Sequence, residues 1–381
     1  MWKKKLAIGL GLTLAMSALA GCSSTGSSTS GPVKIGVIMP LSGQVSAFGQ
    51  SGQKGLQLLE EQTNSAGGIN GRKVSFVFMD DENKAATSVS AAQKLITSDK
   101  VVAIVGPLTS TCANSVAPIA QKYKVPMVTG TGTNANITKA GDYIFRTCFI
   151  DPFQGTVVAK FAFGDLKAKT AAILYNNGDD YSKGLADNFK KSFEGAGGKV
   201  VDSETYNTGD KDFNVQLTKI AGTKPDVLML PDYYNTTAVI AKEARAMGIT
   251  ATFLGGDGWD SADLFTIGGS AVNNSYFSNH YSPDENTPEV VQFIKDYKAK
   301  YNNEVPDAMA ALNYDAGKVL IQSITKAGKT DGASIRSALK AYDGTVVSGH
   351  ITFDKNRDAV KPAVIIVTKD GKEQFFKTVN P

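Results

Sequence analysis

The chain has 381 residues, of which 42% are hydrophobic and 20% charged, and its formal net charge is +4 at pH 7. This length exceeds the usual size of one domain, so two lobes are expected. The body of the chain contains no concentrated run of Lys and Arg, which argues against nucleic acid as a partner.

The first 22 residues have the pattern of a secreted lipoprotein leader. Three lysines at positions 3–5 precede an apolar run at 6–20, which is too short for a permanent membrane span. The run ends in Leu19-Ala20-Gly21-Cys22, which resembles a bacterial lipobox with Cys22 as the lipidated residue. A secretory signal with a chance cysteine is the alternative. Removal of residues 1–21, with three lysines and no acid, would lower the formal charge from +4 to +1.

A flexible tether follows this leader. Residues 23–31 contain only Ser, Thr and Gly, which cannot bury apolar surface. We therefore expect a signal peptide at 1–21, a tether at 22–32 and a folded body from Val33, held outside the cytoplasm on the cell membrane through Cys22. The two remaining cysteines, Cys112 and Cys148, are compatible with one disulfide or with two buried free thiols.

From Val33 the chain alternates short β-branched runs with segments of helical period, which predicts an α/β fold with parallel sheets. Strands are expected at 33–39, 74–79, 101–105, 125–129 and 144–149, with helices at 48–66, 85–98 and 114–123. After a break at Asp151-Pro152 a second series begins. Its strands are expected at 170–175, 199–205, 227–230 and 252–254, with helices at 181–194, 213–221, 236–247 and 262–267.

The last hundred residues are less regular. Helices are expected at 288–301, 308–327 and 334–341, followed by strands at 350–353 and 363–368. Two doubly wound lobes account for the two regular series. The order of the tail suggests that the chain crosses back between them.

Several patterns could indicate catalysis or metal binding, and each has a simpler interpretation. Residues 130–135 fit a dinucleotide-binding fingerprint, but they follow the fourth strand and no convincing helix opens directly after them. His280 and His350 lack the spacing of a nucleophilic or metal site, and the acids at 80–82 lack the EF-hand pattern. We therefore expect a protein that is not an enzyme, with no catalytic residue, metal or cofactor.

Polar and aromatic residues gather at the predicted strand ends, where ligands bind in open α/β sheets. In the first series these are small hydroxyl residues beside glycines, which suit a carboxylate. In the second series they are aromatic rings and one acid. Together they complement a zwitterion with an apolar side chain, and they are found at Ser42-Gly43, Ser110-Thr111 and Thr131 to Thr133, and at Tyr181, Tyr233-Tyr234 and Asp257.

At these residues the chain resembles the branched-chain amino-acid-binding proteins, type I periplasmic binding proteins that serve ABC importers. The resemblance covers residues 33–381. It is carried by ordered segments that match the family: Pro40-Leu41-Ser42-Gly43, Phe48-Gly49, Ala66-Gly67-Gly68-Ile69-Asn70-Gly71, Asp80-Asp81, Gly106-Pro107 with Ser110, Asp179-Asp180-Tyr181-Ser182-Lys183-Gly184 and Gly255-Gly256-Asp257-Gly258.

The resemblance implies two doubly wound parallel-sheet lobes joined by a multi-strand hinge. Lobe 1 would comprise 33–150 and 280–350, and lobe 2 would comprise 151–279 and 351–381. In the family, hydroxyls after the third and fourth strands hold the ligand α-carboxylate, which maps to Ser110, Thr131 and Thr133. An acid after a second-lobe strand, commonly Glu, holds the α-ammonium and maps to Asp257.

Aromatic residues close on the ligand in the family, and these map to Phe48, Tyr181 and Tyr233. Phe48 stands where Tyr is common, and Met309 stands where an aromatic residue is common. Because Met is adaptable, the pocket could accept a side chain other than that of leucine. A position in a helix core is the alternative for Met309.

The implied function is capture of leucine, isoleucine or valine by hinge closure and delivery to a membrane permease, by a monomer outside the cytoplasm. Alternatives are a binding protein for another amino acid, an amide or a short peptide, and a ligand sensor with the same fold.

Overall fold

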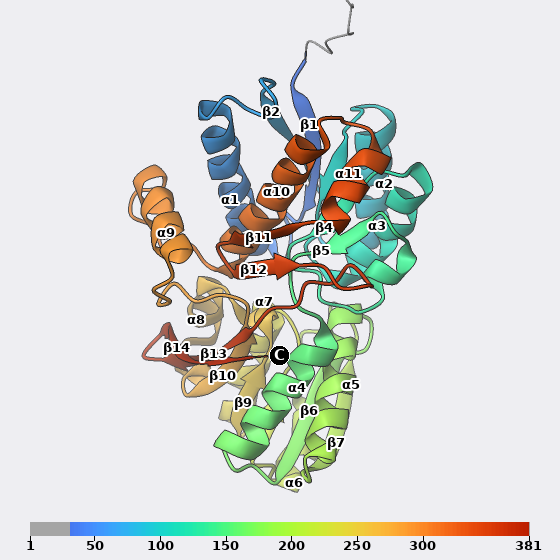
Figure 1. Cartoon of the computed structure of the whole chain (residues 1–381). Helices are drawn as coiled ribbons and strands as arrows, with labels where there is room; N and C mark the ends of the chain where they lie inside the picture. Colours follow the sequence, from blue (N-terminus) through green and yellow to red (C-terminus); the bar gives the residue numbers. More distant parts are fainter. Residues whose placement is uncertain (1–30, 381) are drawn as a thin grey trace, which may run out of the picture. The chain divides into compact units, whose positions relative to one another are not determined.

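Two sheets with related strand orders organise the fold, which a computed structural model describes for residues 31–380 (Figure 1). The predicted lipidation site Cys22 lies outside the described residues. The first sheet has the order β2-β1-β3-β4-β5, and all its strands are parallel. Its strands are β1 (Val33–Met39), β2 (Val74–Asp80), β3 (Ala103–Val105), β4 (Met127–Thr129) and β5 (Ile144–Arg146).

Helices cover both faces of the first sheet, because its strands are apolar on both sides. On one face, α1 (Ser46–Ser65) and α10 (Ala308–Ala327) pack together and share a core with β1 and β3. On the other face, α2 (Ala85–Thr97) and α3 (Ser110–Tyr123) enclose a second core. Further along the chain, α11 (Gly332–Lys340) packs against α10.

The second sheet repeats this order and extends it. In the order β14-β13-β10-β9-β8-β6-β7, five strands from β6 to β10 are parallel and match the first sheet. Two antiparallel strands, β13 and β14, extend this sheet beyond β10, so the second sheet is parallel except at this edge. The strands are β6 (Thr170–Asn176), β7 (Lys199–Tyr206), β8 (Val227–Met229), β9 (Thr252–Gly255), β10 (Ser275–Asn279), β13 (Ala363–Lys369) and β14 (Lys372–Val379).

Six helices belong to this part of the chain or follow it directly. They are α4 (Asp151–Lys160), α5 (Asp180–Gly195), α6 (Asn214–Thr223), α7 (Tyr234–Ala246), α8 (Ala262–Gly268) and α9 (Pro288–Lys300). A π turn at Phe161–Asp165 extends α4, and short 3-10 turns occur at Ile137–Ala140, Asp257–Trp259 and Gly269–Val272. No helix within residues 31–380 is both long and apolar enough to cross a membrane.

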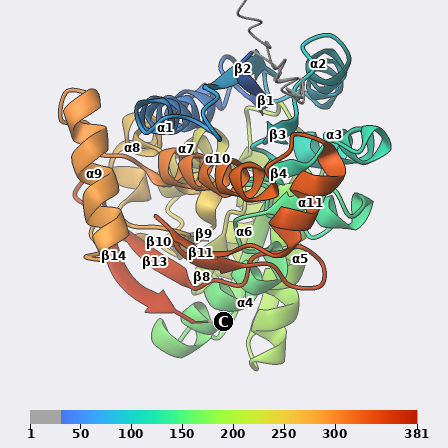
Figure 2. The same cartoon turned by 45° about the horizontal axis from the view of Figure 1, so that its top comes forward.

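The chain passes between the two sheets three times. It leaves the first sheet after β5, returns after β10 to form α9 to α11, and leaves again after the hairpin β11 (Asp343–Val346) and β12 (Gly349–Thr352). Figure 2 shows α10, late in the sequence, lying beside α1 near the start of the chain. This arrangement confirms the predicted α/β fold of two doubly wound sheets with a multi-strand connection.

Candidate functional site

The loops after β3 and β4 lie together at the carboxyl edge of the first sheet. Ser110 is the first residue of α3, and its Oγ accepts a hydrogen bond from the backbone N–H of Asn134 at 3.1 Å. Thr131 donates its hydroxyl to the carbonyl oxygen of Leu108 at 2.7 Å. Each loop is therefore positioned by the other.

The corresponding edge of the second sheet carries aromatic rings and an acid. Tyr181 lies in the first turn of α5, and Tyr233 directly precedes α7. Their rings are stacked, with centroids 5.3 Å apart and planes 15° apart. Asp257 follows β9, and the backbone N–H of the next residue, Gly258, donates to the Tyr181 hydroxyl at 3.0 Å. These contacts place both rings beside the acid.

A cavity of about 20 Å³, here called the central cavity, lies between these two edges. Roughly 10–15 Å³ accommodates one water molecule, so an amino acid enters only if the lining groups move apart. The structure brings together seven of the eight predicted ligand residues. The lining residues are Phe48, Leu108, Thr109, Ser110, Thr131, Tyr181, Tyr233, Asp257, Gly258 and Met309.

Thr133 is the predicted ligand residue that does not line the central cavity. It is fully buried, and its carbonyl oxygen accepts from the N–H of Asp151 at 3.0 Å. Its hydroxyl has no hydrogen-bond partner among the described residues. The loop after β4 therefore directs Thr131 toward the cavity and Thr133 toward the start of α4.

Phe48 and Met309 reach the central cavity from the paired helices α1 and α10. The ring of Phe48 meets that of Tyr233 edge to face, with centroids 5.8 Å apart. Met309 is 3% exposed and belongs to the surrounding hydrophobic core as well as to the cavity wall. The two interpretations of Met309, cavity and core, therefore both describe its position.

Two neutral groups hold the carboxylate of Asp257. Gln154 donates its Nε2 to Oδ1 at 2.8 Å, and Nε2 of His280 lies 3.1 Å from Oδ2. The His280 ring is fully buried and stacks on Phe149, with centroids 3.5 Å apart. Burial lowers the pKa of His280 to about 4, although the hydrogen bond to Asp257 acts in the opposite direction. His280 is therefore neutral near pH 7 and brings no positive charge to the Asp257 carboxylate.

Sequence reasoning missed both of these supports. His280 was considered only as a nucleophilic or metal-site residue, and no spacing pattern connects position 280 with position 257. Gln154 lies on α4, a helix that was not predicted. Only the folded arrangement brings the two donors to one carboxylate.

A buried arginine supports the loop after β4. Arg146 donates from Nη1 to the carbonyl of Gly132 and from Nη2 to that of Asn134, both at 2.8 Å. Its Nε donates to Oδ1 of Asp358 at 2.6 Å, and the arginine side chain has no exposed surface. The glycine-rich segment that fitted a dinucleotide fingerprint thus wraps around a guanidinium group.

Hydrogen bonds also join the two edges beside the central cavity. The Thr111 hydroxyl donates to Oδ2 of Asp179 at 2.8 Å and accepts from the N–H of Asp180 at 2.9 Å. Asn114 donates to Oδ2 of Asp180 at 2.6 Å, and Asn134 donates to the backbone carbonyl of Asp180 at 2.8 Å. The start of α5 is thereby bound to α3 and to the loop after β4.

The two cysteines of the body are free and buried, the second of the two predicted alternatives. Burial raises the pKa of the Cys112 thiol and of the Cys148 thiol to about 12. Both are therefore protonated, unreactive thiols at neutral pH.

Two similarly wound sheets that face each other across a polar and aromatic cavity define a two-lobed ligand-binding fold, not a single-sheet nucleotide-binding domain. Residues 32–373 match the family described as periplasmic binding protein. The chain belongs to this family.

Known relatives agree with this assignment. A Leu/Ile/Val-binding protein homologue of Brucella melitensis is 33% identical over 346 residues, which cover 89% of this chain and 92% of the relative. The structure of a leucine-binding protein of Thermotoga maritima has a TM-score of 0.88 and 37% identity, covering 92% of this chain and 99% of that one.

The isoleucine complex of a branched-chain amino-acid transporter substrate-binding protein of Streptococcus pneumoniae is also similar. Its TM-score is 0.86 at 33% identity, covering 92% of this chain and all of that one (100%). The predicted resemblance to branched-chain amino-acid-binding proteins is therefore confirmed.

Proposed function

We propose that the protein is the extracytoplasmic substrate-binding component of an ABC importer and captures a small amino acid with a branched apolar side chain. One observation carries this proposal. The N-terminus of α3, with the hydroxyls of Ser110 and Thr131, faces Asp257 across the central cavity. The side-chain partners of Asp257 are neutral, and aromatic rings and a methionine form the cavity walls. An α-amino acid has the matching carboxylate, ammonium and side chain.

In this proposal the ligand carboxylate lies at the start of α3, where backbone N–H groups and the Ser110 hydroxyl face it. Thr131 adds a second hydroxyl, and Asp257 receives the ammonium group. The apolar side chain packs against Phe48, Tyr181, Tyr233 and Met309. Thr133 does not line the cavity, and its contact with the ligand stays a prediction from the family resemblance.

We infer that binding proceeds by closure of two lobes, 33–150 with 280–350 and 151–279 with 351–381. Closure removes water from the cleft, and a charge pair worth about 1 kcal/mol in bulk water at 4 Å becomes stronger where the effective dielectric constant is lower. A ligand shifts an equilibrium only through its different affinities for the two states. An amino acid meets this condition because its carboxylate and ammonium contact different lobes.

Calorimetric titration of the ligand-stripped protein with each of the twenty amino acids tests the proposal. We expect leucine, isoleucine or valine to bind most tightly. The absence of binding by any amino acid would assign the cavity to another class of ligand, such as an amide or a short peptide.

Uptake of labelled leucine into cells separates an importer component from a ligand sensor with the same fold. Deletion of the protein abolishes uptake in the first case and leaves uptake unchanged in the second. In neither case does the ligand undergo chemistry, and only the importer component passes it, unchanged, to a permease.

Replacement of Thr111 by valine should favour the open form. The substitution keeps the shape of the side chain but removes two hydrogen bonds between the lobes. At about 1 kcal/mol net for each bond, we expect leucine affinity to fall roughly 3- to 30-fold. Small-angle X-ray scattering should show a larger radius of gyration before leucine is added. Thr97→Val, on the exposed surface of α2, is the control. Unchanged affinity and radius would contradict this role for Thr111.

We further propose that residues 1–21 are a signal peptide and that Cys22 carries a lipid, so that the monomeric body is tethered by 22–32 to the cell membrane, at the cell surface or in the periplasm. Metabolic labelling with a radioactive fatty acid should label the wild type and leave the Cys22→Ala variant unlabelled. Equal labelling of both would refute the anchor.

A further inference from the structure

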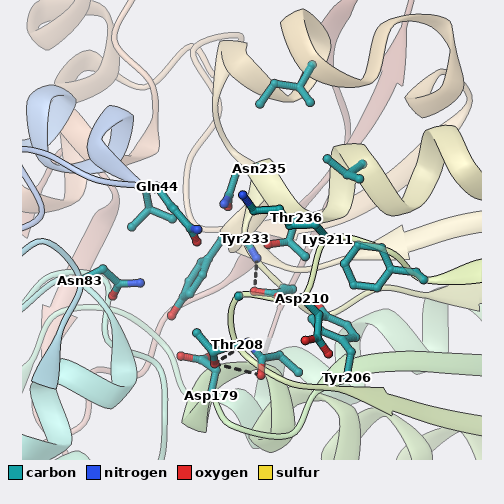
Figure 3. Close-up of a pocket in the computed structure, with 17 residues that line it drawn as sticks. Gln44, Asn83, Asp179, Tyr206, Thr208, Asp210, Lys211, Tyr233, Asn235 and Thr236 are labelled. Atoms are coloured by element: carbon teal, nitrogen blue, oxygen red, sulfur yellow. Dashed lines mark hydrogen bonds between the residues drawn. The ribbon is translucent and has the colours of Figure 1, made fainter. Parts of the chain in front are cut away.

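A second and much larger cavity lies beside the central cavity. This lateral cavity has a volume of about 520 Å³ and opens at the ends of β6, β7 and β8 (Figure 3). Gln44, Val45 and Asn83 line it from the first sheet. Tyr233 lines both cavities and forms the partition between them.

The position of the lateral cavity is the one at which open α/β sheets bind ligands. In the second sheet β6 lies between β7 and β8, so the strand order reverses direction at β6. Ligands occupy the crevice beyond the carboxyl ends of strands at such a reversal. The lateral cavity extends across these strand ends.

The charged groups that line the lateral cavity are mainly acidic. They are Asp179, Asp210, Asp232 and a single cation, Lys211. Asp232 is 3% exposed, its Oδ1 accepts from the N–H of Tyr233 at 2.7 Å, and its Oδ2 accepts from the Tyr206 hydroxyl. Burial raises the pKa of Asp232 to about 7, so a cation bound beside it would favour the ionised carboxylate. Apolar groups supply much of the remaining wall, including those of Phe213, Val239 and Ile267. An aliphatic chain with a cation at its end suits such a surface.

Tyr233 supplies an independent sign of a ligand. The residue is 8% exposed, and its hydroxyl has no hydrogen-bond partner among the described residues. In Figure 3 its ring extends into the cavity, with the hydroxyl directed toward Asn83 and Asp179. A buried polar group without a partner destabilises the fold, so an unpaired hydroxyl at this place marks a position where a polar ligand group can bind.

We propose that the lateral cavity receives the distal, cationic end of a basic amino-acid side chain, such as that of arginine or lysine, when the head group occupies the central cavity. This inference rests on the proposed function and widens its ligand class. Tyr233 turns aside to join the two cavities, the aliphatic stem packs on its ring, and the cation lies near Asp232 and Asp179.

Calorimetry of the ligand-stripped protein with matched ligand pairs tests this proposal. Arginine is compared with citrulline, which has nearly the same shape without the charge, and lysine is compared with norleucine. Leucine is the reference. We expect at least one basic amino acid to bind about tenfold or more tightly than its neutral partner.

Two variants locate the effect. Asp232→Asn removes the charge and keeps an oxygen acceptor for the N–H of Tyr233, and Val239→Phe fills part of the lateral cavity from α7. Each should weaken binding of the basic amino acid about tenfold and leave leucine affinity within about twofold, which also shows that the variant is folded.

The possible outcomes separate this inference from the proposed function. Tight leucine binding with no preference for arginine or lysine over the neutral partners would overturn the lateral-cavity proposal alone. A preference that both variants leave unchanged would also overturn it, because the cation would then lie elsewhere. Failure of every amino acid to bind would overturn the proposed function and this inference with it.

Discussion

Replacement of Asp257 by alanine is expected to weaken leucine binding by about 30-fold or more. Removal of one partner from a buried, hydrogen-bonded charge pair costs about 2–5 kcal/mol, and each 1.4 kcal/mol corresponds to a factor of ten in affinity. Asp257 is 3% exposed, and its two side-chain partners are neutral, so neither partner replaces the lost attraction for an ammonium group.

Isothermal titration calorimetry measures this effect. The control is Asp263→Ala, which removes an exposed acid six positions away on α8. A second ligand, the deaminated leucine analogue 4-methylpentanoate, lacks the ammonium group. It should bind the wild type and Asp257→Ala with similar affinity. An affinity of Asp257→Ala for leucine within threefold of the wild type would assign the ammonium group to another acceptor.

Replacement of Arg146 by methionine should lower the free energy of unfolding by about 3–5 kcal/mol, the usual cost of breaking a buried ion pair from one side. Without the guanidinium group, Asp358 is left as a buried acid, and the carbonyls of Gly132 and Asn134 lose their donors. The loop after β4, which carries Thr131, would then lose its internal support.

Urea denaturation measures this change, with the slope of the transition as a check on two-state behaviour. Arg336→Met is the matched control, because the Arg336–Asp142 pair is partly exposed and such pairs contribute about 0–1 kcal/mol. Addition of Asp358→Leu to Arg146→Met removes the isolated acid and should recover much of the loss. If Arg146→Met proved as stable as Arg336→Met, the buried Arg146–Asp358 pair would contribute little to stability.

Strong local patterns allowed much of the fold to be predicted. The strand at 33–39 and the helix at 308–327 have the predicted bounds. In each of them the spacing of the apolar residues stays the same throughout, and residues typical of loops mark both ends. Asp151-Pro152 was interpreted as a break, but it begins α4, since proline is well suited to the first turn of a helix.

Three strands were not predicted: β11, which pairs only with β12 in a short hairpin, and β10 and β14, whose stability depends on tertiary contacts. The sequence of β10, SYFSN, is largely polar, and β14, KEQFFKTV, is a charged edge strand. Neither has a clean apolar alternation. Each becomes a strand because β13 pairs with both of them.

The central cavity was largely predictable because strand ends of parallel sheets meet at one edge. Ser110, Thr131, Tyr181, Tyr233 and Asp257 all follow strands of the two sheets and line the cavity. The direction of each side chain was not predictable. Side chains only two residues apart in a loop can face different ways: Thr131 lines the central cavity, whereas Thr133 does not.

The three crossings between the sheets have a consequence for the energetics of binding. A single flexible linker would let two bodies tumble independently, and a ligand that joined them would have to remove that freedom. We expect three connections to restrict the two proposed lobes to a narrow range of relative orientations before any ligand arrives. In the proposed closure less orientational entropy would then be lost, so more of the contact energy in the cavity would be expressed as affinity.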